Sequence, residues 1–203
     1  MINPSTLDWQ KTPSGLLPAI VQDAQTAQVL MLGWMNEEAL QRTLKTGFVT
    51  FYSRSKKRIW RKGETSGNDL RLVECVNDCD RDTLLLRAIP RGPTCHNGTP
   101  SCFANAAELP VETLGLLQRT IDERAASSRN DSYTCSLLRG GVAACGAKVL
   151  EEAEEVVRAA REEGKQRTIE EAADLLYHLL VLQRSQNVTL RDVADELRKR
   201  RQP

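Results

Sequence analysis

The sequence predicts two domains of different class, a β-rich α+β domain over residues 1–112 and an all-α helical bundle over 113–203. Segments rich in β-branched and aromatic residues, separated by Gly and Pro, fill the first half. Ala, Leu, Glu and Arg dominate the second half, which has almost no strand signal. The composition changes over 104–113, and 203 residues suffice for two small domains. We therefore place a boundary near residue 112.

The first half predicts strands and one helix. Asn36 is a good helix cap, Glu37 and Glu38 suit the first turn, and the helix should end near Lys45, before Gly47. Two of the later strands should form a hairpin whose turn is 78–82. The expected strands cover residues 17–23, 29–34, 48–53, 70–76 and 83–89.

The second half predicts helices with definite ends. Thr168 can cap a helix, because Glu171 follows at the spacing of a capping box. Thr189 can cap the last helix, with Asp192 in its first turn. Between the first two helices, 130–134 should be a loop. The expected helices cover residues 114–127, 135–163 (ending at Gly164), 168–182 and the segment after Thr189.

Composition argues against several classes of protein. The formal net charge of +1 gives no strong field toward nucleic acid or membranes. No apolar run approaches the roughly 18 residues of a membrane span, and the first residues do not resemble a signal peptide. Six cysteines in such a chain indicate free thiols or metal ligands. We expect a cytoplasmic protein without nucleic-acid or membrane partners.

Carboxylates and a thiol alternate at 78–82. If this segment is extended, Asp78, Asp80 and Asp82 point to one side and Cys79 to the other. The oxygen ligands suit Mg²⁺, and the thiolate suits Zn²⁺. An ordinary acidic turn is the alternative, and the two further cysteines described next argue against it.

Three cysteines follow the spacing C-x15-C-x6-C, with Cys95 and Cys102 in a loop rich in Gly and Pro. Together with Cys79 they would supply three thiolates and leave one position for water, which is the pattern of catalytic zinc sites. His96 adjoins Cys95 and is a candidate for proton transfer or substrate contact.

A basic segment, 53–68, contains six cations, several hydroxyl side chains and two glycines. Cations and hydroxyls can hold phosphate oxygens, and glycine lets backbone N–H groups approach an anion. A solvated hairpin with a basic turn explains the composition equally well.

Acidic residues recur at helical spacing in the second half. Residues three apart share a helix face, so Glu152 pairs with Glu155 and Glu171 with Asp174. If their helices are antiparallel, the four carboxylates converge and require cations, for which Mg²⁺ is suited. A solvent-exposed acidic face is the alternative.

Residues near the four carboxylates refine this interpretation. The segment 174–182 is largely apolar, so Asp174 and His178 should be buried there. Glu151 and Glu154 should be solvated or should orient water.

These motifs resemble two enzyme families. The first half is similar to phosphoribosyl-AMP cyclohydrolase through WMN at 34–36, SRS at 53–55, WRKGETSGN at 60–68, DCDRD at 78–82, GPTCH at 92–96 and SCF at 101–103. The second half resembles phosphoribosyl-ATP pyrophosphohydrolase, a relative of the MazG-type pyrophosphatases, through SYT at 132–134, KVLEEAEE at 148–155 and EAADLLYH at 171–178. The order of the halves is that of the fused histidine-biosynthesis enzymes.

The resemblance implies two hydrolyses of small nucleotides. The C-terminal domain would convert phosphoribosyl-ATP to phosphoribosyl-AMP and pyrophosphate, and the N-terminal domain would open the adenine ring of phosphoribosyl-AMP. A homodimer would share the zinc ligands between its chains. The implied Zn²⁺ ligands are Cys79, Cys95 and Cys102, and the implied Mg²⁺ ligands are Asp78, Asp80 and Asp82 in one domain and Glu152, Glu155, Glu171 and Asp174 in the other.

The remaining implied roles are catalytic or substrate-binding. We expect His96, Glu151 and Glu152 to be catalytic, and Arg54, Lys62 and Ser66 to contact phosphate. Two alternatives stay open. The C-terminal domain could be a general house-cleaning nucleotide pyrophosphatase, or the N-terminal domain could be a structural zinc module for dimerisation.

Overall fold

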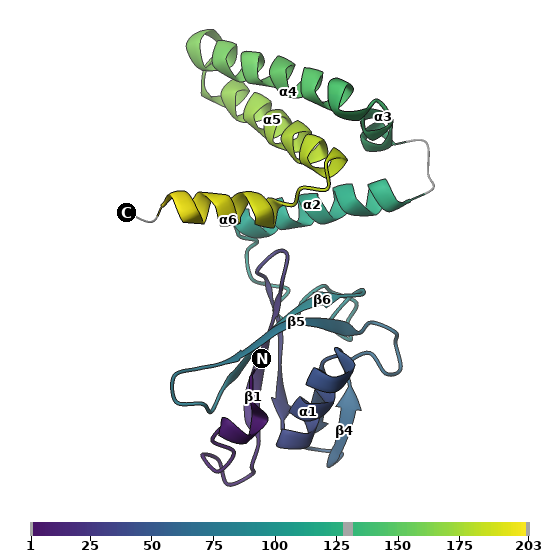
Figure 1. Cartoon of the computed structure of the whole chain (residues 1–203), viewed down its shortest axis with the longest axis vertical. Coiled ribbons are helices and arrows are strands. Elements are labelled where there is room, and N and C mark those ends of the chain that lie inside the picture. The colour runs from purple at the N-terminus through teal and green to yellow at the C-terminus, as the bar shows by residue number, and fades with distance from the viewer. Residues whose placement is uncertain (1, 128–131, 202–203) are drawn as a thin grey trace. The chain divides into compact units, whose positions relative to one another are not determined.

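A computed structural model describes residues 2–127 and 132–201 of the chain. The chain divides into two compact units, Met1–Glu112 and Thr113–Pro203. The first contains all the named strands and the second is helical, so the predicted fold classes are confirmed (Figure 1). In the described part of the chain, no helix is both long enough and apolar enough to cross a membrane.

The first unit contains a four-stranded sheet of order β2-β1-β6-β5 and a separate two-stranded hairpin, β3-β4. Strand β1 runs antiparallel to β2 and parallel to β6, and β5 runs antiparallel to β6. The bounds are β1 Leu17–Asp23, β2 Val29–Met35, α1 Glu37–Thr46, β3 Thr50–Ser53, β4 Arg58–Arg61, β5 Leu70–Asn77 and β6 Leu84–Pro90, after a short 3-10 turn at Pro4–Thr6.

Helix α1 has the ends that the sequence predicts. The Asn36 side chain accepts a hydrogen bond from the backbone N–H of Ala39 at 2.9 Å. Gly47 has a φ of +74°, which glycine adopts at little cost and which ends the helix. The helix packs its buried Leu40 into the core formed by one face of the sheet.

The core of the first unit follows the alternation of β1. Leu17, Ala19 and Val21 are fully buried and meet Leu84 and Leu86 of β6 on the same face. The intervening residues of each strand point to the opposite face of the sheet, which therefore carries a different set of side chains.

The hairpin predicted with its turn at 78–82 is confirmed, since β5 and β6 are antiparallel and the segment between them is a turn in which Arg81 adopts a φ of +65°. The alternation expected of an extended segment therefore does not apply. One detail of this unit differs from expectation. The strand predicted over 48–53 begins at Thr50, although Phe48 makes an isolated bridge to Arg71. The basic segment forms the hairpin that was one of its two interpretations, with β4 as the second strand.

The second unit is built from helices, of which α4 and α5 pack along each other (Figure 1). Its core contains Ile121, Leu137, Cys145, Leu180 and Val181. The bounds are α2 Pro110–Ala126, α3 Tyr133–Arg139, α4 Gly141–Arg158, a π-helical turn Ala159–Glu163, α5 Lys165–Ser185 and α6 Leu190–Arg200.

Glycines break the long helix predicted over 135–163. Gly141 has a φ of +67°, which separates α3 from α4. The last turn before Gly164 is π-helical. Of the loop predicted over 130–134, residues 130 and 131 lie outside the described residues, whereas Tyr133 and Thr134 belong to α3.

One predicted cap is wrong and one is confirmed. Helix α5 begins at Lys165, so Thr168 lies inside it and its hydroxyl donates to the Gly164 carbonyl at 2.9 Å. Thr189 forms the predicted capping box. Its hydroxyl accepts from the Asp192 N–H at 3.2 Å, and its own N–H donates to the Asp192 carboxylate at 2.8 Å.

Candidate functional site

The turn between β5 and β6 gathers three carboxylates. Ligand oxygens of Asp78, Asp80 and Asp82 lie within 4.8 Å of one another. The Asp78 carboxylate folds the turn by accepting the backbone N–H groups of Asp82 and Thr83, each at 3.1 Å. Burial acts to raise the pKa of Asp78, but the hydrogen bonds from Thr83 and Asp82 outweigh it and hold this pKa below its usual value. The carboxylates therefore converge through a turn instead of through an extended strand.

Lys11 closes this aspartate cluster from a distant part of the chain. Its Nζ lies 3.0 Å from Asp80 Oδ2 and 3.5 Å from Asp82 Oδ2. The hydrogen bond to Asp80 raises the pKa of Lys11. Sequence reasoning missed Lys11, because no local pattern links it to the turn. Three carboxylates with a single ammonium group keep a net negative charge, which fits a site for Mg²⁺.

The three cysteines predicted as zinc ligands separate into a pair, Cys95 and Cys102, and a single residue, Cys79. Cys95 and Cys102 line the same open pocket, of about 660 Å³. The backbone N–H of Asn97 lowers the pKa of the Cys95 thiol, whereas burial and the neighbouring Cys95 charge raise that of Cys102. Across the residues that the structure describes, no group of three ligands within 4.8 Å includes a cysteine. Cys79 therefore does not join the pair within one chain.

His96 stands beside the thiol pair. Its Nδ1 lies 3.9 Å from Cys95 Sγ, and the residue is exposed. An exposed imidazole next to a thiol of lowered pKa can exchange protons with solvent and with a bound molecule.

A basic pocket of about 570 Å³ lies between β2 and the β3-β4 hairpin, and Arg54, Lys62 and Ser66 all line it. The aromatic rings of Trp34 and Trp60 form part of its wall, which the sequence analysis did not anticipate. The Arg54 guanidinium lies 4.5 Å from the centre of the Trp34 ring. The hairpin and the anion-binding interpretations are therefore compatible, because the hairpin forms one wall of a pocket with cations and aromatic rings.

Lys62 connects the basic pocket to the thiol pair. Its Nζ donates to the Asn68 carbonyl at 3.3 Å. Burial lowers the pKa of Lys62, and the charges of Cys102 and Cys95 act in the opposite direction. Lys62 thus lines the basic pocket and is near enough to both thiols for their charges to act on it.

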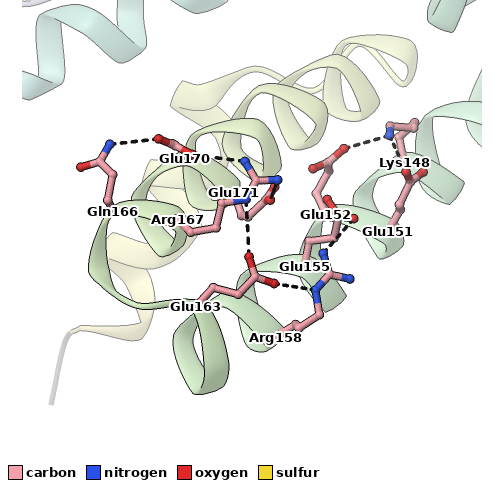
Figure 2. A network of polar contacts seen from close by, with 10 residues as sticks. All are labelled: Lys148, Glu151, Glu152, Glu155, Arg158, Glu163, Gln166, Arg167, Glu170 and Glu171. Carbon is pink, nitrogen blue, oxygen red and sulfur yellow. Dashed lines mark hydrogen bonds and ion pairs between the residues drawn. The ribbon is translucent and has the colours of Figure 1, made fainter.

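Helices α4 and α5 bring three glutamates together (Figure 2). Ligand oxygens of Glu152, Glu155 and Glu171 lie within 4.8 Å of one another. Glu152 is 6% exposed and Glu171 is 2% exposed, so both carboxylates have lost most of their water. Burial raises the pKa of Glu171, and the charges of Glu155 and Glu152 add to this rise, although Arg167 opposes it.

Each carboxylate of this glutamate cluster has a cation from its own helix. Lys148 Nζ lies 2.9 Å from both Glu151 and Glu152. Arg158 contacts Glu155 at 3.3 Å, and Arg167 forms an ion pair with Glu171 (Figure 2). Sequence reasoning missed all three cations, although their spacings of three or four residues from the glutamates could have identified them.

The cluster fits a metal ion in its donor atoms and in the burial of its carboxylates. Buried Glu171 Oε1 is held by an ion pair with the Arg167 guanidinium. A divalent cation binds carboxylate oxygens of this kind and could take the place of the guanidinium.

Of the two residues predicted to be buried, His178 is buried and Asp174 is not. Asp174 is exposed and does not belong to the cluster, so the chain brings three of the four expected carboxylates together. His178 is 5% exposed, and its Nε2 lies 3.6 Å from Glu152 Oε1. Burial lowers the pKa of His178 and outweighs the opposite effect of Glu152, so the imidazole is neutral at pH 7. Glu151 and Glu154 are exposed, in agreement with a solvated position.

Comparisons with known proteins match the two halves separately and then the whole chain. Residues 31–104 match the family model described as phosphoribosyl-AMP cyclohydrolase, and residues 114–201 match that of phosphoribosyl-ATP pyrophosphohydrolase. A protein of Vibrio cholerae named histidine biosynthesis bifunctional protein HisIE is 49% identical over 96% of this chain and 93% of its own length. The proteins of that name from Escherichia coli K12 and Salmonella typhimurium are 49% and 48% identical, each over 97% of this chain and 96% of its own length.

Proposed function

Because the chain belongs to the HisIE family of bifunctional histidine-biosynthesis proteins, we propose that it hydrolyses two successive forms of one nucleotide. The C-terminal domain hydrolyses phosphoribosyl-ATP to phosphoribosyl-AMP and pyrophosphate. The N-terminal domain opens the adenine ring of phosphoribosyl-AMP by hydrolysis. The observation that carries this proposal is that each family match encloses one cluster of candidate ligands, residues 78–82 in the first and 152–171 in the second.

In the C-terminal domain, Glu152, Glu155 and Glu171 would hold Mg²⁺. Asp174, one turn after Glu171 on α5, would be a fourth ligand, and Glu151 would orient water. The support is the burial of Glu152 and Glu171 close to Glu155, since like charges in one buried cluster require cations. Bound Mg²⁺ would neutralise phosphate oxygens and orient the anhydride that is cleaved. Glu152 has a second role, because it keeps Lys148 and His178 beside the cluster.

In the N-terminal domain, Asp78, Asp80 and Asp82 would hold Mg²⁺. The basic pocket would bind the nucleotide, with Arg54, Lys62 and Ser66 on its phosphates and the flat Trp34 ring against its base. His96 would transfer protons during ring opening, since its ring is exposed beside the thiol pair.

Zinc would be bound by Cys95 and Cys102 together with Cys79 of the partner subunit. This sharing is supported by the separation of Cys79 from the pair within one chain. When bound, Zn²⁺ would make water nucleophilic near neutral pH. The use of thiols as metal ligands suits a reducing compartment, so we infer a cytoplasmic location.

The sheet offers a surface for the homodimer. On the face opposite the core, the strand register places Leu32 beside Ile20, Ile20 beside Leu85, and Leu85 beside Val76. This apolar row crosses all four strands, and its ends are exposed, Leu32 by 47% and Val76 by 39%. A second copy of the chain would bury the row and bring its Cys79 to the thiol pair of the first.

Rates of pyrophosphate release test the first activity. The full chain should hydrolyse phosphoribosyl-ATP with a higher kcat/KM than any member of a panel of nucleoside triphosphates. A preference for the panel would instead identify a house-cleaning pyrophosphatase and reject the proposal.

Oligomeric state and metal content test the second activity. Cys102→Ser should reduce the zinc content, as metal analysis would measure, and dimer formation, as sedimentation would detect. Asp80→Asn should leave the dimer intact and abolish ring opening. If the wild type opened no adenine ring, the N-terminal domain would be a structural zinc module and the proposal would be wrong. If Asp80→Asn kept full ring opening, the proposed role of the aspartate cluster would be wrong.

A further inference from the structure

Three side-chain cations pair with the glutamate cluster of α4 and α5 (Figure 2). Lys148 pairs with Glu152, Arg158 with Glu155, and Arg167 with Glu171. The same cations also pair with Glu151, Glu163 and Glu170, so six carboxylates share three cations and the network is negatively charged. The cations therefore offset only part of the repulsion among the carboxylates.

Arg167 and its carboxylate differ more in exposure than the other two pairs of the cluster. The Arg167 side chain is 45% exposed, whereas that of Glu171 is 2% exposed. Besides the ion pair with Glu171, Arg167 donates a hydrogen bond to Glu170 at 3.2 Å. Arg167 is therefore a solvent-accessible cation that contacts a buried carboxylate.

Arg167 also has partners that remain if it leaves Glu171. Glu170 accepts its hydrogen bond, and Glu163 lies 3.6 Å from its Nε. Both of these carboxylates are partly exposed at the edge of the cluster (Figure 2). Its displacement from Glu171 would thus keep the guanidinium paired, so the exchange costs little.

We propose that Arg167 takes the place of a metal ion at Glu171 in the metal-free protein, and that it binds the polyphosphate of the substrate once the metal ion occupies that carboxylate. This inference rests on the proposed function of the C-terminal domain. A guanidinium group and a divalent cation compete for the same carboxylate oxygens. Each Mg²⁺ that enters adds two positive charges to the cluster, which makes it more favourable for a polyphosphate anion to bind there.

The planar fork of arginine suits the second role. It can bind two phosphate oxygens at once, whereas lysine offers a single point charge. Metal and substrate would then bind in order, since Arg167 is freed for phosphate only after the metal has replaced it.

Calorimetric titration of Mg²⁺ into the substrate-free full chain tests the competition. The titration uses an Asp80→Asn background, so that the measured Mg²⁺ binding is that of the glutamate cluster and not that of the aspartate cluster. Arg167→Gln should tighten Mg²⁺ binding by about fivefold, because the competing cation is gone. The Mg²⁺ affinity of Arg167→Lys should lie between those of the wild type and of Arg167→Gln. Arg191→Gln removes the same charge on α6, where Arg191 lies 3.9 Å from Asp195, and should leave the affinity unchanged.

Binding of inorganic tripolyphosphate to the Mg²⁺-loaded chain tests the second role. Arg167→Gln should weaken it by about tenfold, and Arg167→Lys should restore part of the loss. Equal Mg²⁺ affinity of the wild type and both Arg167 variants would overturn the inference, as would unchanged tripolyphosphate binding. If the wild-type cluster bound no Mg²⁺ at all, the proposed function of this domain would fail with it.

Discussion

Replacing Glu152 with glutamine separates the two proposed activities within one chain. The substitution keeps the shape of a side chain that is 6% exposed and removes its charge. Two effects on folding then oppose each other. The ion pair with Lys148, at 2.9 Å, is lost, which costs about 1 kcal/mol. Repulsion by the neighbouring Glu155 and Glu171 is relieved, which stabilises the domain.

We therefore expect the free energy of unfolding of Glu152→Gln to stay within about 1 kcal/mol of the wild type. The effect on metal binding should be much larger. Changing a group that only supports a metal ligand typically lowers metal affinity or activity by 10- to 100-fold, so losing a charged ligand should cost at least about 100-fold in pyrophosphate release. Ring opening should be unaffected, because the residues proposed for it lie in the other unit.

The two activities of Glu152→Gln can be measured on the same preparation. Pyrophosphate release from phosphoribosyl-ATP reports the C-terminal domain, and the absorbance change on ring opening of added phosphoribosyl-AMP reports the N-terminal domain. Circular dichroism establishes that the variant is folded. Loss of both activities in a folded protein would refute separate sites, and retention of full pyrophosphate release would refute the role of the glutamate cluster.

Three further predictions concern the N-terminal unit. Asp80→Asn should abolish ring opening while pyrophosphate release persists, as parallel assays would measure; equal loss of both would contradict it. Gly33→Ala should destabilise the unit by about 1–3 kcal/mol in a chemical denaturation experiment, because its Cβ would lie 2.3 Å from the buried Phe51 ring. In metal-free protein, Cys95 should react with iodoacetamide before Cys75, because backbone N–H groups lower the pKa of Cys95 and burial raises that of Cys75 to about 11. The Cys95 rate should level off at a lower pH than the Cys75 rate; mass spectrometry of the labelled peptides would expose the reverse order.

Local chemistry explains which ends of helices the sequence predicts. The caps at Asn36 and Thr189 follow from hydrogen bonds within one helical turn, which the sequence contains completely. Thr168 has the same local pattern but lies inside α5, because Gly164, with a φ of +92°, already ends the preceding segment. The adjacent glycines at 140 and 141 were a recognisable break that the helical periodicity on both sides concealed.

Burial and exposure depend on neighbours that no local pattern specifies. Asp174 follows Glu171 at the spacing that places both on one helix face, yet it is exposed while Glu171 is buried. The apolar residues after Asp174 indicated a buried segment, but Leu176 is 46% exposed and Leu179 is 36% exposed. An apolar run predicts that a helix has a buried face and not which of its residues another helix covers.

The sequence by itself determined the chemistry of the ligands, the classes of the two domains and the spacing that pairs Glu152 with Glu155. Residue type and helix or strand periodicity act over a few residues, so they can be read from a short segment. Only the tertiary structure decided that Glu171 completes the glutamate cluster and that Cys79 forms no three-ligand group with Cys95 and Cys102. The same holds for the contact of Lys11 with Asp80, which lies 69 residues away in the sequence. These contacts arise from the packing of the whole chain, where many weak interactions together select one arrangement.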